Sequence, residues 1–269
     1  MTDNRAADAA AALLLTHWSA GTRLRELPAP VRPANRSDAY EIQRALARQS
    51  RQKIVGWKIA ATSRVGQQHI GVDGPLAGCL LADRVATDAS AESPVTFRLQ
   101  NNVMRVAEAE FAFRMKQALP ARDAAYEMPE VLAAVGSMHP AIEVPDSRYD
   151  DFAAVGAPQL IADCACACWW AVAQAADDSW RALDLATHAV ETFLNGTTAA
   201  TGVGANVLGD PRIALTWLAN ELRTYDSGLR AGDWVTTGTC IVPVTIAPGD
   251  VVRAEFGVLG AVTVRLEGS

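Results

Sequence analysis

The stretch VMRVAEAEFAFRM, residues 103–115, decides both the expected fold and the expected chemistry of this chain. Its largely apolar composition is typical of a strand. Residues i and i+2 of a strand point to the same face, so the carboxylates of Glu108 and Glu110 would lie roughly 6.5–7 Å apart on one side. A third acid, Glu143, follows in the apolar segment 140–143. We expect a neighbouring strand to deliver it.

Carboxylates placed so close together repel each other, and a buried pair either takes up a proton or captures a cation. A divalent ion about 2.1 Å from each oxygen fits the gap, and Glu143 would complete one face of an octahedron. Ligation by oxygen alone, with open positions, suits Mg²⁺ or Mn²⁺ better than zinc. The alternative is that Glu108 and Glu110 face solvent on an edge strand.

Working outward from this stretch, the N-terminal part is helical by pattern. Residues 6–18 have high helix propensity, and a second helix capped by Asn35 or Ser37 extends to about Gln52. Residues 54–61 form a buried strand, and Ser63 caps a short helix that ends near Gly71.

The remainder is rich in strands, with few helices. Strands are expected at 78–85, 94–99, 103–115, 139–145, 163–173, 185–195, 233–238, 251–256 and 259–266, helices at 128–137 and 211–226, and a glycine-rich loop at 202–206. Helices and strands do not alternate regularly, which indicates an α+β fold rather than a doubly wound sheet.

The composition excludes several classes of function. The net charge of −6, without a dense cluster of lysine and arginine, argues against a nucleic-acid surface. No run of about 18 apolar residues exists, so we expect no membrane span. The opening carries Asp3, Arg5 and Asp8 and lacks the pattern of a secretory signal. Five cysteines, an odd number, favour a reduced cytoplasmic location.

Several motifs, in this order, resemble a known family. They are Gly56-Trp57-Lys58-Ile59-Ala60-Ala61-Thr62-Ser63, Gly71-Val72-Asp73-Gly74-Pro75, Glu108-Ala109-Glu110, Pro140-Ala141-Ile142-Glu143 with Asp146-Ser147-Arg148, Leu208-Gly209-Asp210-Pro211 through Trp217-Leu218-Ala219-Asn220, and Leu229-Arg230-Ala231-Gly232-Asp233. From about Pro28 onward the chain is similar to the 2-hydroxypenta-2,4-dienoate hydratase and 4-oxalocrotonate decarboxylase group of the fumarylacetoacetate hydrolase superfamily.

The resemblance implies a mixed β-roll with an N-terminal helical region. We therefore expect a helical region over residues 1–52 and a catalytic β-roll domain over 53–269. The resemblance makes Glu108, Glu110 and Glu143 the ligands of Mg²⁺ or Mn²⁺. It also makes Lys58 and Asp73 catalytic residues, although an aspartate before glycine is ordinary in a turn.

The implied activity is a metal-dependent hydratase of aromatic catabolism. It would add water to a 2-hydroxy-2,4-dienoate or 2-oxo-enoate and give a 4-hydroxy-2-oxo acid, with the metal stabilising negative charge on the C2 oxygen. Lys58, its pKa lowered by burial near the cation, would shuttle the proton. The resemblance also implies a homo-oligomer and an association with a pathway enzyme.

Four alternatives stay open. The first is a decarboxylase of the same group, in which Arg148 or Arg105 would hold a second carboxylate. The second is a hydrolase of acylpyruvates, disfavoured because none of the four histidines forms a recognisable pair with an acid. The other two are a non-catalytic partner subunit, against which Lys58 and the three acids argue, and a small-molecule binding protein.

The chain departs from the family pattern at 163–168. An Asp-Asn-Ala-Ser type of segment is replaced by Asp163-Cys164-Ala165-Cys166-Ala167-Cys168. On a strand, the three cysteines would share one face, too far apart to bind a single soft metal, so we interpret them as packing residues. The loss of polar groups there leaves the exact substrate open.

Overall fold

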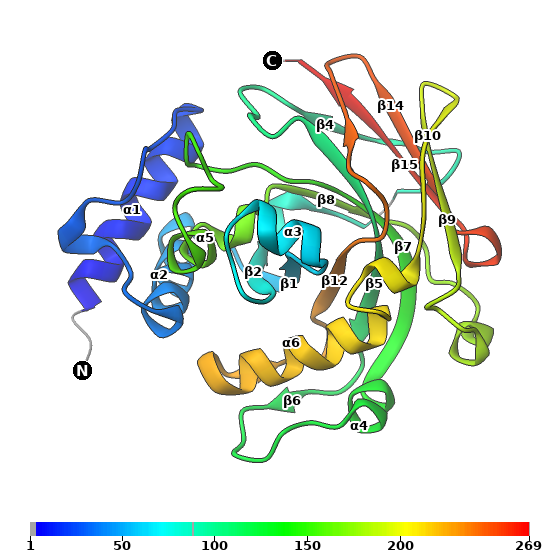
Figure 1. Cartoon of the computed structure of the whole chain (residues 1–269), viewed down its shortest axis with the longest axis horizontal. Helices are drawn as coiled ribbons and strands as arrows, with labels where there is room; N and C mark the ends of the chain where they lie inside the picture. The colour runs from blue at the N-terminus through cyan, green and yellow to red at the C-terminus, as the bar shows by residue number, and fades with distance from the viewer. Residues whose placement is uncertain (1–3, 88, 269) are drawn as a thin grey trace.

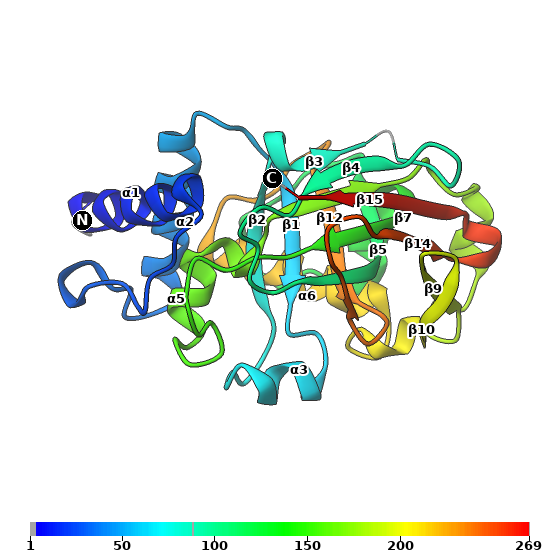
Figure 2. The same cartoon turned by 90° about the horizontal axis from the view of Figure 1, so that it is seen from above.

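The computed structural model describes residues 4–87 and 89–268. The helices α1 (Asn4–Ala20) and α2 (Arg36–Ser50) lie at one end of the molecule, near the N-terminus, whereas the strands fill the middle and the other end, with further helices beside them (Figures 1 and 2). Within the described residues the α-helices are α1 (Asn4–Ala20), α2 (Arg36–Ser50), α3 (Arg64–His69), α4 (Met128–Ala133), α5 (Ala157–Ala162) and α6 (Pro211–Tyr225).

The strands form two main sheets. Over the described ranges they are β1 (Ile54–Ala60), β2 (Leu76–Leu81), β3 (Val85–Ala86), β4 (Val95–Arg98), β5 (Val106–Met115), β6 (Leu119–Pro120), β7 (Val135–Val144), β8 (Trp169–Val172), β9 (Ala189–Leu194), β10 (Thr197–Val203), β11 (Gly228–Leu229), β12 (Trp234–Thr239), β13 (Val244–Thr245), β14 (Val251–Glu255) and β15 (Ala261–Glu267). The larger sheet has the order β2-β1-β12-β5-β7-β8-β3, with β13 also on β5, and the second has the order β10-β9-β14-β15-β4. Both sheets mix parallel and antiparallel neighbours.

The long strand β5 explains how one sheet builds both a core and a site. It begins at Val106 rather than 103 because Arg105 has a left-handed backbone (φ 50°), and the Asn102 side chain accepts a hydrogen bond from the Arg105 amide. Alternate residues then face opposite sides. Phe111 points toward the second sheet and packs edge-to-face on Phe256, at 5.1 Å between ring centroids. Glu108 and Glu110 therefore face the other side.

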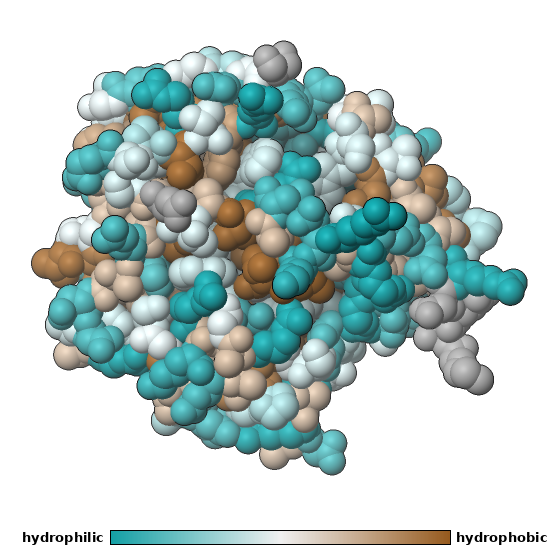
Figure 3. Space-filling view, turned by 180° about the vertical axis from the view of Figure 1, so that it is seen from behind, coloured by the Kyte–Doolittle hydropathy of each residue, from teal (hydrophilic) through white to brown (hydrophobic). Residues whose placement is uncertain are grey.

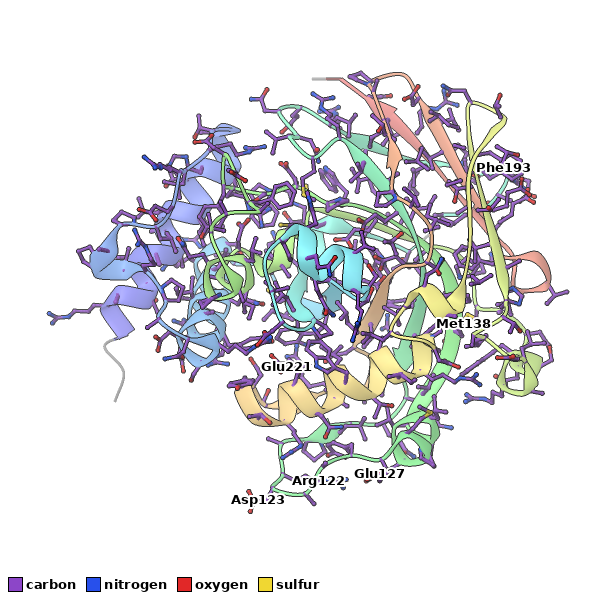
Figure 4. The ribbon with its side chains drawn as sticks, viewed as in Figure 1. Arg122, Asp123, Glu127, Met138, Phe193 and Glu221 are labelled. Carbon is purple, nitrogen blue, oxygen red and sulfur yellow. The ribbon has the colours of Figure 1, made fainter. Side chains whose placement is uncertain are left out.

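The N-terminal helices are joined to the roll by polar contacts as well as apolar packing. Asn35 caps α2 by accepting a hydrogen bond from the Asp38 amide. Glu221, on α6 (Figure 4), accepts hydrogen bonds from Arg36 at 2.6 Å and from the Tyr40 hydroxyl at 2.9 Å, both on α2. These contacts fix α2 against α6.

Most predicted elements are present, with three corrections. The helix expected at 128–137 ends at Ala133, because the chain from Val135 pairs with the end of β5. The strand expected at 163–173 is only Trp169–Val172, preceded by the end of α5 and a turn. The strand β10, paired with β9, was not predicted, and it includes residues 202 and 203 of the predicted loop.

Small apolar patches are surrounded by hydrophilic side chains on the face seen in Figure 3. Among the described residues, no helix is both long enough and apolar enough to span a membrane.

Candidate metal centre

Three carboxylates from two neighbouring strands meet on one face of the larger sheet. Glu108 on β5 lies directly opposite Glu143 on β7, and Glu110 follows two residues later on the same face of β5. One oxygen from each acid lies within 4.8 Å of the other two. Among the described residues, these acids form the only group of histidine, cysteine and acidic side chains dense enough to hold a metal ion.

The triad is almost entirely removed from water. Glu110 and Glu143 are fully buried, and Glu108 is partly buried. The Thr236 hydroxyl donates to Glu110 Oε2, whereas Glu110 Oε1 and Glu143 Oε2 are buried without a hydrogen-bond donor among the described residues. Burial raises the pKa of all three acids, to about 7 for Glu108, and mutual repulsion adds to the rise for Glu108 and Glu110.

This arrangement fits a divalent cation. Oxygens in octahedral positions around an ion at about 2.1 Å are roughly 3–4 Å apart, so small side-chain rotations would close the triad around Mg²⁺ or Mn²⁺. The unpaired oxygens of Glu110 and Glu143 are candidate ligand atoms, because a buried carboxylate without a donor is costly unless a cation compensates it. All three donors are hard oxygens, which Mg²⁺ and Mn²⁺ prefer.

Lys58 reaches the triad from two strands away. It lies on β1, which β12 separates from β5, and its Nζ is 3.0 Å from Glu143 Oε1 and 3.1 Å from the Ala165 carbonyl oxygen. The lowered pKa was expected for Lys58 beside a bound cation, and the metal-free site differs from that state. Burial does lower the pKa of Lys58, but the combined attraction of the three carboxylates outweighs it and raises the pKa above its usual value.

The Ala165 carbonyl is presented by an unusual turn. Cys164, Ala165 and Cys166 all have left-handed backbone conformations, with φ of 51°, 49° and 64°. The strand predicted here is therefore wrong, and the cysteines do not alternate along one face. Gly78 on β2 allows the turn to approach, since a Cβ at this position would be 1.8 Å from the Cys164 oxygen.

The cysteines are buried packing residues, as expected. Cys164, Cys166 and Cys168 are each at most 8% exposed. The Cys164 and Cys79 sulfurs are 3.5 Å apart. Burial raises the pKa of Cys166 and of Cys168 to about 12, so both are thiols at neutral pH. Within the described chain no cysteine belongs to a group that could hold a metal.

A buried ion pair holds the turn in place. Asp163 accepts hydrogen bonds from the Arg148 guanidinium, from the Arg148 amide at 3.0 Å and from the Ser147 hydroxyl at 3.1 Å. Arg148 also donates to the Ala167 carbonyl at 3.1 Å. Its guanidinium is thus fully engaged inside the protein. Arg105 donates to the carbonyls of Asn102 and Gln100.

The structure does not bring Asp73 to the triad. Asp73 is exposed in the turn between α3 and β2, and its side chain forms no hydrogen bond or ion pair with a described residue. All four histidines have structural contacts: His17 with the Thr22 hydroxyl and His188 with the Phe256 carbonyl, besides the two described next. His69 meets Phe152 edge-on at 6.0 Å between ring centroids, and His139 binds the Ser137 hydroxyl and the Ala173 carbonyl.

Comparison with known proteins decides the family. Residues 90–267 match the model described as fumarylacetoacetate (FAA) hydrolase C-terminal. The chain belongs to the fumarylacetoacetate hydrolase family. It is 33% identical to a 2-keto-4-pentenoate hydratase of Paraburkholderia xenovorans, over 87% of this chain and 84% of that protein. It is 31% identical to a 4-oxalocrotonate decarboxylase of Pseudomonas putida, over 85% of this chain and 84% of that protein.

A solved structure from the same group agrees with the fold. The 4-oxalocrotonate decarboxylase from Pseudomonas putida G7, complexed with magnesium and adipate, superimposes with a TM-score of 0.87 at 26% identity, over 99% of each chain. The mixed β-roll expected from the sequence is thereby confirmed. The segment matched to the fumarylacetoacetate hydrolase family contains all three acids but begins after Lys58.

Two parts of the candidate site were not anticipated from the sequence. Thr236 on β12 supports Glu110 through its hydroxyl, and the only local signal is the polar pair Thr236-Thr237 inside a buried strand. The Ala165 carbonyl leaves no signal in the sequence, because any residue supplies a carbonyl.

Proposed function

We propose that this protein is a metal-dependent hydratase that adds water to a 2-hydroxy-2,4-dienoate, by way of the 2-oxo-enoate, to give a 4-hydroxy-2-oxo acid. The observation that carries the proposal is the buried triad of Glu108, Glu110 and Glu143 with the Lys58 ammonium 3.0 Å from Glu143. Relatives named as 2-keto-4-pentenoate and 2-hydroxyhexa-2,4-dienoate hydratases, 31–33% identical to this chain, support this choice of reaction. The pathway would be the catabolism of aromatic compounds.

The three glutamates would hold Mg²⁺ or Mn²⁺. When bound, such an ion supplies Lewis acidity to the carboxylate and 2-oxygen of a 2-oxo acid. The metal complexes of the structural relatives, with magnesium in one and calcium in another, support a divalent ion. The sheet contributes rigidity, because two of the acids face each other across a paired β-ladder and Thr236 fixes the third.

Lys58 would transfer protons during the reaction. In the metal-free site the neighbouring carboxylates favour its charged form, and in the proposed reaction Lys58 acts as the proton donor. The dienol loses its hydroxyl proton and gains one at C5, which gives the 2-oxo-3-enoate. Water then adds its oxygen to C4, and C3 gains a proton. Each step gives up and takes up one proton, which a single ammonium near the substrate can relay.

Asp73 would act from the turn between α3 and β2. Its exposure in the present conformation means that this role requires the turn to move toward the triad. An Asp73→Asn variant would then lose turnover while keeping its affinity for Mg²⁺. Unchanged turnover would remove Asp73 from the site.

The test uses the purified full chain with 2-hydroxypenta-2,4-dienoate. We expect loss of the dienol absorbance that depends on added Mg²⁺ and stops with EDTA. Glu143→Gln should abolish it, and Lys58→Met should lower kcat by about 100-fold or more, the scale of one acid–base group. Glu127→Gln, on an exposed loop (Figure 4), serves as the matched control and should be unchanged. Full activity in EDTA, or in Glu143→Gln, refutes the proposal.

A decarboxylase of the same group is the second candidate, favoured by the structural likeness to 4-oxalocrotonate decarboxylase. Such an enzyme must hold a carboxylate at the far end of its substrate. Arg148 cannot supply this contact, since Asp163 and backbone carbonyls already engage its guanidinium. Release of carbon dioxide from 2-oxohex-3-enedioate, faster than hydration of the dienol, would establish the decarboxylase instead.

The organisation of the chain is also proposed. Residues 1–52 would form a helical region beside a catalytic β-roll of residues 53–269, and the protein would work as a homo-oligomer in the cytoplasm, with a pathway enzyme as a further partner. Sedimentation of the purified chain, alone and with a candidate enzyme that uses its product, measures both associations. A single monomeric species at micromolar concentration would exclude the homo-oligomer.

A further inference from the structure

A small cavity between α1 and the strands β4 and β8 is lined by an excess of positive charge. Its volume is about 30 Å³. Its lining residues include four arginines but a single acidic residue, Asp146; the arginines are Arg23, Arg84, Arg98 and Arg148. None of the four residues proposed for metal binding and proton transfer, Lys58 among them, is part of the lining.

Arg23 is the most unusual of these arginines. Its side chain is only 8% exposed, and it donates to Asp146 at 2.8 Å and to the Asn101 carbonyl at 2.6 Å. Its Nε is buried and has no acceptor among the described residues. A buried donor on a charged group that lacks an acceptor is costly, and native structures normally compensate it with a ligand or water.

Arg84 is held between two indole rings. Its guanidinium carbon lies 5.0 Å from the centroid of Trp18 and 4.4 Å from that of Trp169. Its one ion pair with a described residue is long, 3.5 Å to Asp83. The rings fix the plane of the guanidinium by stacking, which leaves its edge donors directed outward around the sandwich.

Arg98 completes the cationic lining. Its side chain is exposed and forms no hydrogen bond or ion pair within the described ranges, although Glu267 is its backbone neighbour on β15. Arg148 is satisfied by Asp163, and its guanidinium lies 4.1 Å from the Trp18 ring centroid. Unused donors therefore belong to Arg23, Arg84 and Arg98.

We propose that this cavity binds the carboxylate group of a small organic acid. A volume of about 30 Å³ accommodates about two water-sized oxygens, which matches the two oxygens of a carboxylate better than the four of a phosphate. Guanidinium groups recognise carboxylates through paired N–H donors. The acid would bridge Arg23, in the segment after α1, to Arg98 on β4, and so join the N-terminal helices to the second sheet.

The competing occupant is water, which would satisfy Arg23 Nε without any net charge. Bound water and a bound anion can be distinguished. Only a bound anion gives a saturable response that follows the anion concentration and requires the arginines. Trp18 and Trp169 flank Arg84 and so provide a reporter within the site.

The experiment is a titration of the metal-free full chain with sodium acetate, read by tryptophan fluorescence and by melting temperature. EDTA is present so that no metal at the glutamates can attract acetate, and sodium chloride keeps the ionic strength constant. We expect a saturable change in both signals. Arg98→Gln and Arg84→Gln should each weaken the apparent affinity by about 10-fold or more, as expected for loss of one charged hydrogen-bonding partner.

Arg181→Gln is the matched control, because Arg181 lies 4.5 Å over the Trp180 ring centroid but outside this cavity. It should bind acetate as the wild type does. Arg98 is exposed, so Arg98→Gln should fold with unchanged circular dichroism. A response that does not saturate, that chloride reproduces, or that both cavity variants retain would overturn the proposal and assign the space to water.

Discussion

Neutralising one acid of the triad should stabilise the protein in the absence of metal. Two full charges on oxygens about 4.8 Å apart would repel by about 3 kcal/mol at an effective dielectric constant of about 20, and proton uptake by Glu110, whose pKa is raised, keeps the actual repulsion below this value. Lys58 offsets part of this repulsion, so we expect Glu110→Gln to raise the free energy of unfolding by about 2 kcal/mol at pH 8 in EDTA. The glutamine oxygen can still accept the Thr236 hydrogen bond. For a chain of this size the gain corresponds to an increase in melting temperature of about 4–8 °C.

With magnesium bound, the wild type should become more stable than Glu110→Gln. A bound ion stabilises the wild type by about 3 kcal/mol at a hundred times its dissociation constant, whereas Glu110→Gln has lost one ligand and should gain much less. Thermal melts in EDTA and in excess MgCl₂ measure both effects, with Glu127→Gln as the surface control (Figure 4). A Glu110→Gln protein less stable than wild type in EDTA would show that the carboxylate is not under repulsion. Equal stabilisation of both proteins by magnesium would show that Glu110 is not a ligand.

Three further predictions concern stability. Gly78→Ala should cost about 3 kcal/mol or more in chemical denaturation, because its Cβ would overlap the Cys164 carbonyl; a gain, as alanine normally gives in a strand, would refute the close approach. Arg148→Met should cost about 3–5 kcal/mol because it leaves Asp163 buried without its partner, and a loss below 1 kcal/mol would contradict this. Burial raises the pKa of Glu108 from 4.5 to about 7, so the folded state binds the proton more tightly, and stability from this group is lost as the pH rises from about 4.5 through 7. In EDTA the stability difference between Glu108→Gln and wild type should therefore widen over that interval by about 1–2 kcal/mol, allowing for the partial exposure of Glu108, and a constant difference would refute the shift.

The grouping of the three acids was largely predictable because it depends on strand parity. Acids at i and i+2 share a face whatever the exact ends of the strand, so the late start of β5 at Val106 did not affect the inference. The local sequence determines the position of Glu143 less strictly. A shift of one residue in the register of β7 against β5 would have pointed its side chain to the face opposite Glu108 and Glu110. The register of β5 against β7 is set by many pairs, which include Phe113 with Met138.

The turn at 164–166 could not be predicted, because it depends on contacts distant in sequence rather than on a local pattern. Alternating small and apolar residues favour a strand, and three successive non-glycine residues with positive φ are intrinsically unfavourable. Contacts distant in sequence compensate this cost. Asp163 is fixed by Arg148, and Gly78 provides the space beside Cys164. The tertiary structure therefore overrides the local preference.

The chemistry of this turn explains why its cysteines are compatible with a functioning site. Lys58 contacts the carbonyl of Ala165, which any residue can supply, so replacing polar side chains by thiols at 164 and 166 preserves that contact. The Cys164 thiol points to Cys79 in the core. Cys166 is close enough to Lys58 for the ammonium to lower its pKa, against the larger opposite effect of burial. Cys164 therefore packs against Cys79, whereas Cys166 lies near the Lys58 ammonium. Any altered substrate preference should accordingly arise from Cys166 rather than from Cys164.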